Sequence, residues 1–122
     1  MNLYDVAEAL NLTVIAGNDS LKRKVRTGYV SDLFIEVLSN SNHGDLWITA
    51  RIYHSIVAVA VFKEHIGIIV VGGNRPDVET IRRAREKGLP LFTTPLPAFE
   101  VAGKLFAMGV KGVTEKRGKQ LS

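Results

Sequence analysis

Residues 66–88, IGIIVVGGNRPDVETIRRAREKG, decide the fold class. The first six form an apolar run that is nearly continuous, as is typical of a parallel strand covered on both faces. A glycine pair ends this run, and Pro76 and Asp77 begin a helix that is acidic in its first turn and basic toward its end, as the helix dipole favours. Gly88 follows as the C-terminal stop. The stretch therefore predicts a strand, a turn and a helix, which is the repeating unit of an α/β sheet.

The same alternation continues on both sides of this unit. Apolar periodicity and turn residues predict further elements by their spacing. In chain order we expect a helix over 3–10, strands over 12–15 and 25–30, a helix over 31–38, a strand over 45–49, a helix over 55–62, a strand over 66–71, a helix over 76–87, a strand over 89–93 and a helix over 99–109. This order predicts one α/β domain with a mainly parallel sheet of four to six short strands and helices packed on its faces.

Residues 55–62, SIVAVAVF, are the ambiguous element, because they are apolar on all sides. The β-branched residues favour a strand. However, residues 63–65, KEH, offer no Gly, Pro or Asn for the turn that a hairpin with the next strand would need. We therefore predict a buried helix.

The positive charge of the chain is concentrated at its C-terminus. The net charge is +4, and residues 111–122, KGVTEKRGKQLS, contain four basic side chains and one acidic side chain. A polar, glycine-containing basic terminus is typical of a solvated tail. We predict a single domain over residues 1–110 and a flexible tail over residues 111–122, and we do not expect nucleic-acid binding.

The composition also indicates the cellular compartment in which the protein works. The chain has no cysteine, which excludes disulfides, thiolate metal sites and thiol nucleophiles and fits a reducing compartment. Its first residues, MNLYDVAEALN, carry acids where a signal peptide would have a basic flank, and no stretch approaches the ~20 apolar residues of a membrane span. We expect a cytoplasmic protein without a membrane segment.

Ligand-binding residues are expected where the parallel strands end. In open α/β sheets, ligands bind outside the carboxyl ends of the strands, where helix N-termini and loop backbone collect. If the four later strands are parallel, the segments that follow them share one edge of the sheet, and their small residues, hydroxyls and two guanidinium groups suit an anion. The candidates are Ser31, Asp32, Thr49, Arg51, Gly72, Gly73, Asn74, Arg75, Thr93 and Thr94, with His54 as a further contact near that edge.

Within this set the segments differ in their suitability for an anion. We expect Ser31 to cap a helix and Asp32 to lie in its first turn, where the carboxylate takes the place that the helix dipole offers to a phosphate. Asp32 then suits a hydroxyl, amide or amine donor, and segments 49–51 and 72–75 are the better anion sites. The alternative is that all these residues have only turn and cap roles, since such residues end the strands of every α/β protein.

No motif points to catalysis, a metal or a cofactor. The glycine pair lacks the Lys-Ser/Thr sequel of a P-loop and the spacing of a dinucleotide fingerprint. His43, His54 and His65 lie eleven residues apart without a carboxylate pattern of the HExxH kind. No serine sits in a GxSxG elbow, and paired carboxylates are missing. The opening helix is followed by a strand rather than by a recognition helix, which disfavours a helix-turn-helix. We predict a non-catalytic protein with no metal and no cofactor.

The pattern of the whole chain resembles the DRTGG domain family, which is related in fold to the N-terminal domain of HPr kinase. The matching segments are GYVSDL (28–33), GDLWIT (44–49), HSIVAVAV (54–61), GIIVVGGNRPD (67–77), GLPLFTT (88–94) and FEVAGKLFAMG (99–109). The resemblance implies a three-layer α/β domain and a helix over 55–62. Ser55 stands where many relatives would have Asn, so a shared polar contact at that helix start is not carried over.

The resemblance also implies a function. Such domains are regulatory and often dimeric, and they occur beside nucleotide-sensing or phosphoryl-transfer machinery, as in some phosphotransacetylases and some pyrophosphatases with CBS domains. We therefore expect a regulatory module that binds a small anionic metabolite or nucleotide and acts as a homodimer or through a partner enzyme or a CBS- or kinase-type protein.

Two other readings of the function stay open. The first is a pure interaction domain without a small ligand, with an apolar surface on the last helix that comprises Phe99, Val101, Leu105 and Met108. The second is an enzyme that uses Asp32 or His54, for which the sequence supplies no substrate.

Overall fold

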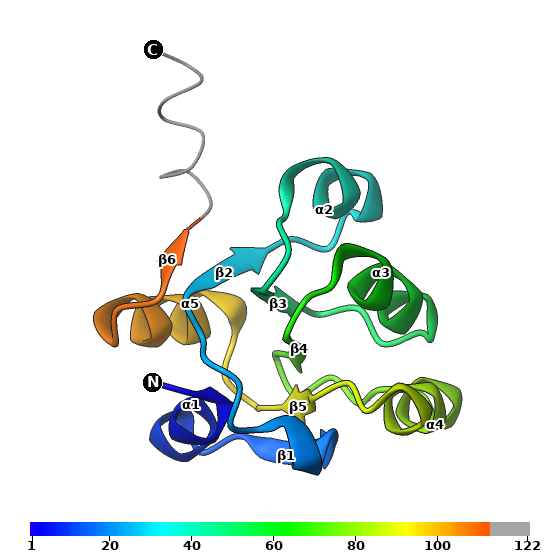
Figure 1. Cartoon of the computed structure of the whole chain (residues 1–122), viewed down its shortest axis with the longest axis horizontal. Helices are drawn as coiled ribbons and strands as arrows, with labels where there is room; N and C mark the ends of the chain where they lie inside the picture. The colour runs from blue at the N-terminus through cyan, green and yellow to red at the C-terminus, as the bar shows by residue number, and fades with distance from the viewer. Residues whose placement is uncertain (113–122) are drawn as a thin grey trace.

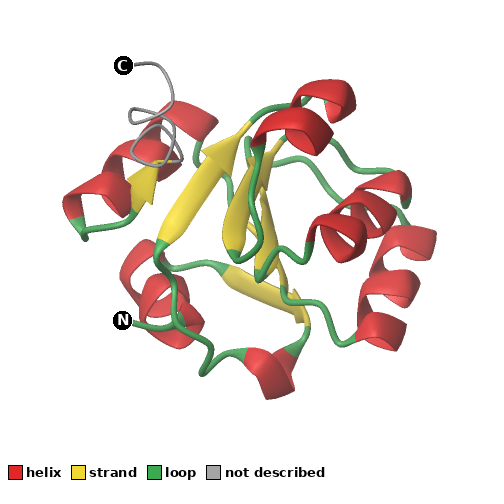
Figure 2. Ribbon diagram, turned by 45° about the horizontal axis from the view of Figure 1, so that its top comes forward, coloured by secondary structure: helices red, strands yellow, loops and turns green. Residues whose placement is uncertain are grey.

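The computed structural model describes residues 1–112, which form an α/β domain (Figures 1 and 2). Within these residues the predicted alternation of helices and strands is confirmed. The elements are α1 (Leu3–Leu10), β1 (Thr13–Ala16), the 3-10 turn η1 (Asn18–Ser20), β2 (Thr27–Val30), α2 (Phe34–Asn40), β3 (Asp45–Thr49), α3 (Ser55–Lys63), β4 (Gly67–Val70), α4 (Val78–Lys87), β5 (Leu91–Thr93), α5 (Ala98–Ala107) and β6 (Lys111–Gly112). No helix among them combines the length and the apolar character needed to cross a bilayer.

The sheet is mixed but mostly parallel, with the strand order β1-β5-β4-β3-β2-β6. Strands β2 to β5 run parallel to one another, and β6 pairs in parallel with β2. The edge strand β1 pairs with β5 in the antiparallel direction, with a register shift between Val14 and Ala16. The predicted mainly parallel sheet is confirmed, and β1 is its antiparallel edge.

Helices cover both faces of the sheet, which confirms the three-layer architecture (Figure 1). Because side chains alternate along a strand, Leu46 and Ile48 of β3 pack with α1 and α5, whereas Trp47 between them packs with α2, α3 and α4. Strand β4 divides its residues in the same way. The central strands thus have apolar residues on both faces, which explains their continuous apolar runs.

Helix α3 is the element predicted from an ambiguous sequence, and the helix is confirmed. Ile56, Val57, Val59 and Ala60 are buried, because α3 lies between α2 and α4 on the same face of the sheet. Phe62 stays 76% exposed at the C-terminal end. The exposed positions Ala58, Val61 and Phe62 are apolar as well, which accounts for the lack of an amphipathic period.

Two predictions about the start of α2 are wrong. The helix begins at Phe34, and Leu33 is its N-cap without a side-chain cap bond. The hydroxyl of Ser31 instead accepts a hydrogen bond from the Leu33 amide (3.1 Å), two residues on. Asp32 therefore lies before the helix rather than in its first turn. A short-range turn at Ser31 has taken the place of the expected cap, as serine side chains permit.

The surface that we predicted on the last helix is also different. Val101 and Leu105 face the core between α5 and the sheet, and only Phe99 and Phe106 stand well exposed, at 85% and 67%. Lys111 and Gly112, expected at the start of the tail, form β6 beside β2. The rest of the predicted tail, residues 113–122, lies outside the described residues.

Candidate functional site

Parallel pairing brings the four predicted segments to one edge of the sheet. Strands β2, β3, β4 and β5 all end there, so residues 31–32, 49–51, 72–75 and 93–94 follow neighbouring strands at their carboxyl ends. The structure then divides them into two groups. The residues of one group hydrogen-bond to one another, and the residues of the other group line a pocket.

Asp32, Thr49 and Arg51 form the first group. The Asp32 carboxylate accepts hydrogen bonds from the Thr49 hydroxyl (2.7 Å) and from the Ala50 amide (2.8 Å). The Arg51 guanidinium donates to the Asp32 carbonyl (3.0 Å) and lies 4.5 Å above the Phe34 ring. These groups satisfy one another, so this side of the edge links the ends of β2 and β3. Asp32 bonds a hydroxyl and an amide of the protein itself, so the prediction that it suits such donors of a ligand stays a prediction.

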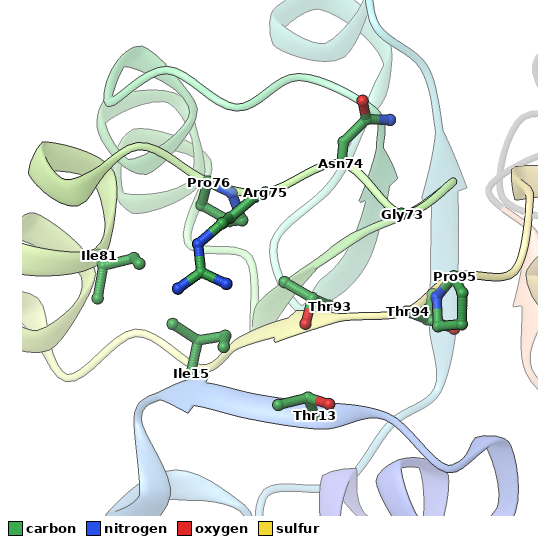
Figure 3. Close-up of a pocket in the computed structure, with 10 residues that line it drawn as sticks. All are labelled: Thr13, Ile15, Gly73, Asn74, Arg75, Pro76, Ile81, Thr93, Thr94 and Pro95. Atoms are coloured by element: carbon green, nitrogen blue, oxygen red, sulfur yellow. The ribbon is translucent and has the colours of Figure 1, made fainter.

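The second group lines a pocket of about 150 Å³. The pocket lies between β1, the loop after β4 and the loop after β5 (Figure 3). Of the predicted residues it contains Gly73, Asn74, Arg75, Thr93 and Thr94. Thr13, Ile15, Pro76, Ile81 and Pro95 complete its lining.

Arg75 is the charged side chain of this pocket. Its guanidinium group extends from the β4–α4 loop toward Ile15 and Thr93 (Figure 3). Within residues 1–112 it forms no ion pair, and the hydroxyls of Thr13 and Thr93 carry no hydrogen bond. A guanidinium and two hydroxyls are therefore available over a floor of aliphatic carbon.

The glycine pair does not form a phosphate loop. Gly72 and Gly73 both have φ of +74°, a backbone conformation that glycine adopts most easily. Their amides donate to the carbonyls of Leu96 (2.7 Å) and Thr94 (3.0 Å). These bonds tie the β4–α4 loop to the β5–α5 loop, and the two N–H groups are thereby used within the protein. Gly73 is part of the pocket lining, but neither glycine offers its amide to a ligand.

Other predicted residues have structural roles or lie apart. The Asn74 side chain points away from the pocket (Figure 3), and its amide donates to the Val71 carbonyl (2.8 Å). Thr94 is buried, and its hydroxyl accepts from the Leu96 amide (3.1 Å). His54 is exposed at the start of α3, makes no cap bond there and does not line the pocket.

Sequence reasoning missed Thr13 and Ile15. Both were placed on a strand, but a strand over 12–15 carries no local signal for its neighbour in the sheet. Pairing of Thr13 with Thr93 across β1 and β5 brings them to the pocket, 80 residues apart in the chain. Their contribution depends on strand order alone.

His65 is a second residue whose environment was missed. It is 3% exposed, and its Nε2 lies 2.8 Å from the Ser41 hydroxyl. That hydroxyl donates its own hydrogen to the Val37 carbonyl (2.6 Å), so Nε2–H of His65 is the donor to Ser41. Nδ1 is buried without a partner among residues 1–112. Burial lowers the pKa of His65 to about 4, against the opposing field of Asp45.

The described residues contain no group of three or more His, Cys, Asp or Glu side chains placed to hold a metal ion. At the carboxyl edge of the sheet, the Arg75 guanidinium and the hydroxyls of Thr13 and Thr93 line the pocket.

Comparisons with known proteins agree with the fold and with the resemblance. The structure is similar to that of the CBS and DRTGG domains of the regulatory region of Clostridium perfringens pyrophosphatase, complexed with the activator diadenosine tetraphosphate, with a TM-score of 0.72 and 22% sequence identity over 84% of this chain. The match spans 45% of that chain. A comparison with curated proteins finds no match. The family model of the DRTGG domain matches residues 5–108, nearly all of the described sequence, and this chain therefore belongs to the DRTGG domain family.

Proposed function

We propose that this domain is a non-catalytic, ligand-sensing regulatory module. It binds a small anionic metabolite or nucleotide at the carboxyl ends of the strands and acts as a homodimer or through a partner protein. The observation that carries the proposal is the Arg75 guanidinium, which has no ion-pair partner within residues 1–112 and faces the pocket that Thr13 and Thr93 also line.

The size of the pocket limits what it holds. Sites that enclose a drug-sized ligand have volumes of roughly 300–1,000 Å³. At about 150 Å³, this pocket suits one phosphoryl or carboxylate group, with the rest of the ligand outside it. A guanidinium binds such a group through paired N–H donors, and a threonine hydroxyl adds a further donor. The pocket therefore binds the anionic end of a ligand, and the rest of the ligand lies outside it.

The structural comparison supports the class of ligand. The similar regulatory region of the Clostridium perfringens pyrophosphatase was solved with diadenosine tetraphosphate, a nucleotide that is an activator of that enzyme. A nucleotide or another phosphorylated metabolite is accordingly the first class to test with this chain.

The test is a thermal-shift screen against nucleotides and phosphorylated metabolites, followed by calorimetric titration of any compound that stabilises the protein. Arg75→Gln should weaken binding of such a compound by about tenfold or more, because it removes a charge-assisted pair of hydrogen bonds. Lys104→Gln is the control, since this exposed lysine on α5 lies far from the pocket lining and loses the same charge. Equal weakening by both substitutions, or no stabilisation by any compound, would count against the proposal.

A second candidate is a pure interaction domain without a small ligand. The observation that favours it is the exposure of Phe99 and Phe106, which lie two helical turns apart on α5. Sedimentation velocity decides between the two. The interaction domain would be favoured by a dimer that forms without ligand and dissociates with Phe99→Ser and Phe106→Ser. The ligand screens should then detect no binding.

A further inference from the structure

Four basic residues gather in the segment that leads from η1 into β2. Lys22, Arg23, Lys24 and Arg26 are all exposed, and none forms an ion pair within residues 1–112. With these four set aside, residues 1–112 carry nine basic and eleven acidic side chains. The net positive charge of the described chain therefore resides in this segment.

Three of these side chains surround a hollow of about 590 Å³. Arg23, Lys24 and Arg26 line it together with Thr27, Gly44 and Ile66, which lie at the beginnings of β2, β3 and β4. Because these strands are parallel, the hollow is at the amino edge of the sheet. It is thus separate from the Arg75 pocket, which lies at the carboxyl edge.

The backbone that carries these bases is fixed by hydrogen bonds from other elements. The Leu3 amide donates to the Arg23 carbonyl (3.1 Å), and the Val25 amide donates to the Met1 carbonyl (3.2 Å). On the other side, the Lys111 amide at β6 donates to the Arg26 carbonyl (3.0 Å). The segment runs beside α1 to the start of β2 (Figure 1). The backbone needs no ordering when a ligand binds, which favours affinity.

Within residues 1–112, the acids close to the hollow form no ion pair with its basic side chains. Asp45 is fully buried, and its carboxylate accepts hydrogen bonds from the Thr27 hydroxyl and the Asn42 amide. Glu64 lies 3.3 Å from His43, which also lines the hollow. On α4, by contrast, the basic side chains of Arg82 and Arg83 both form ion pairs with Glu79. The positive charges of the hollow are left for a ligand.

We propose that this hollow is a second anion site, which binds a small ligand carrying a chain of phosphates. Its volume lies within the roughly 300–1,000 Å³ of small-molecule sites, and two guanidinium groups and an ammonium suit several phosphate groups in a row. Among the described residues, no Phe, Tyr or Trp lines the hollow to stack a nucleic-acid base, and His43 is the one aromatic ring there, which favours a phosphate chain over a single-stranded nucleic acid.

The experiment is calorimetric titration of the full chain with inorganic tripolyphosphate at constant ionic strength. Three variants are compared with the original protein: the double variant Arg23→Gln/Arg26→Gln, the charge-matched control Lys87→Gln/Lys104→Gln, and Arg75→Gln at the other edge. We expect the first to weaken binding by about tenfold or more and the other two to change it by less than about twofold. In amide NMR spectra, the shifts should map to residues 23–27 and 43–45.

Three results would overturn the assignment. Equal weakening by the two double variants, or shifts confined to residues 72–75 and 93–94, would show that tripolyphosphate does not bind in the hollow. Tighter binding of a single-stranded oligonucleotide than of tripolyphosphate, at the same salt concentration and with the same loss in Arg23→Gln/Arg26→Gln, would replace the small ligand by a nucleic acid. Of these results, only shifts confined to residues 72–75 and 93–94 concern the Arg75 pocket, where they would place tripolyphosphate instead.

Discussion

The carboxylate of Asp32 joins the ends of two neighbouring strands. It is exposed at the end of β2, yet one oxygen accepts from the buried hydroxyl of Thr49 and from the amide of Ala50 beyond β3. A buried hydroxyl that loses its acceptor destabilises a protein by about 1–3 kcal/mol, so a structural role suffices to explain this acid.

At the residue scale, Gly17 should tolerate no side chain. Its φ is +78°, and a Cβ there would lie 2.4 Å from backbone atoms of Pro90. Gly17→Ala should destabilise the fold by about 3 kcal/mol, because both strain and a backbone clash must be relieved. Gly103→Ala on the exposed side of α5 meets nothing within 4 Å and should stabilise the protein by up to about 1 kcal/mol. Urea denaturation measures both, and a loss of similar size in the two variants would contradict this reading.

Because His65 is buried, we expect a specific loss of stability in acid. Burial lowers the pKa of the folded state to about 4, whereas the unfolded chain has the ordinary value of 6.5. Below pH 6.5 the unfolded state therefore takes up a proton that the folded state excludes, and stability falls by up to about 3 kcal/mol between pH 6.5 and pH 4. Urea denaturation as a function of pH should show a shallower decline for His65→Gln.

A direct check on His65 is the NMR titration of its imidazole ring. In the folded protein, the ring resonances should stay at their neutral positions through pH 5. A titration midpoint near 6.5 would show that burial does not perturb the pKa of this residue.

At the element scale, helix ends are set by short-range bonds. The Asn2 side chain accepts from the Asp5 amide (2.9 Å), and the Asp5 carboxylate accepts from the Asn2 amide (2.9 Å), which completes a capping box at α1. At the C-terminus of another helix, α4, Gly88 adopts the left-handed conformation (φ of 63°). Its amide donates to the carbonyls of Ala84 and Arg85. Such signals act within a few residues and agree with the predicted start of α1 and the predicted end of α4.

The capping box of α1 can be tested by substitution. Asn2→Ala should destabilise the protein by about 1 kcal/mol, because it removes the acceptor for an otherwise unpaired helix amide. If the two bonds act as a unit, the double variant Asn2→Ala/Asp5→Ala should lose less stability than the sum of the single variants in urea denaturation. Strict additivity would show that the two bonds are independent.

At the scale of the whole molecule, the Arg75 pocket joins the two ends of the sequence. Strand β1 supplies Thr13 and Ile15 from the N-terminal part of the chain, whereas the loop after β4 supplies Arg75 and the end of β5 supplies Thr93. A ligand that bridges these walls would hold an edge strand against the rest of the sheet. Binding would thereby change the stability of an element that pairs with one neighbour, β5, among the described strands.

This coupling predicts a change in hydrogen exchange. With a saturating anionic ligand identified in the screen, the amides of β1 (Thr13–Ala16) should exchange about tenfold more slowly than without it, because the ligand must leave before the edge strand opens. Arg75→Gln should abolish the effect at the same ligand concentration. Unchanged exchange in β1 despite bound ligand would show that the ligand does not bridge the two walls.

The sequence by itself determined the elements, the α/β class and the edge at which Arg75 lies. Apolar runs, the Asn2 cap and the glycine at 88 act over a few residues, so they are readable without a partner. The family pattern added the three-layer arrangement of a DRTGG domain and supported the helix that the residues already predict over 55–62.

The tertiary structure alone decided which residues of that edge are free. Asp32 and Arg51 bond each other and Thr49 across a strand boundary, and the amides of Gly72 and Gly73 bond a loop more than 20 residues away, so the predicted anion sites lose most of their donors. The antiparallel pairing of β1 with β5 brings Thr13 beside Thr93, which makes the pocket around Arg75. Strand order and competition for hydrogen-bond donors depend on residues distant in the chain, and no local pattern encodes them.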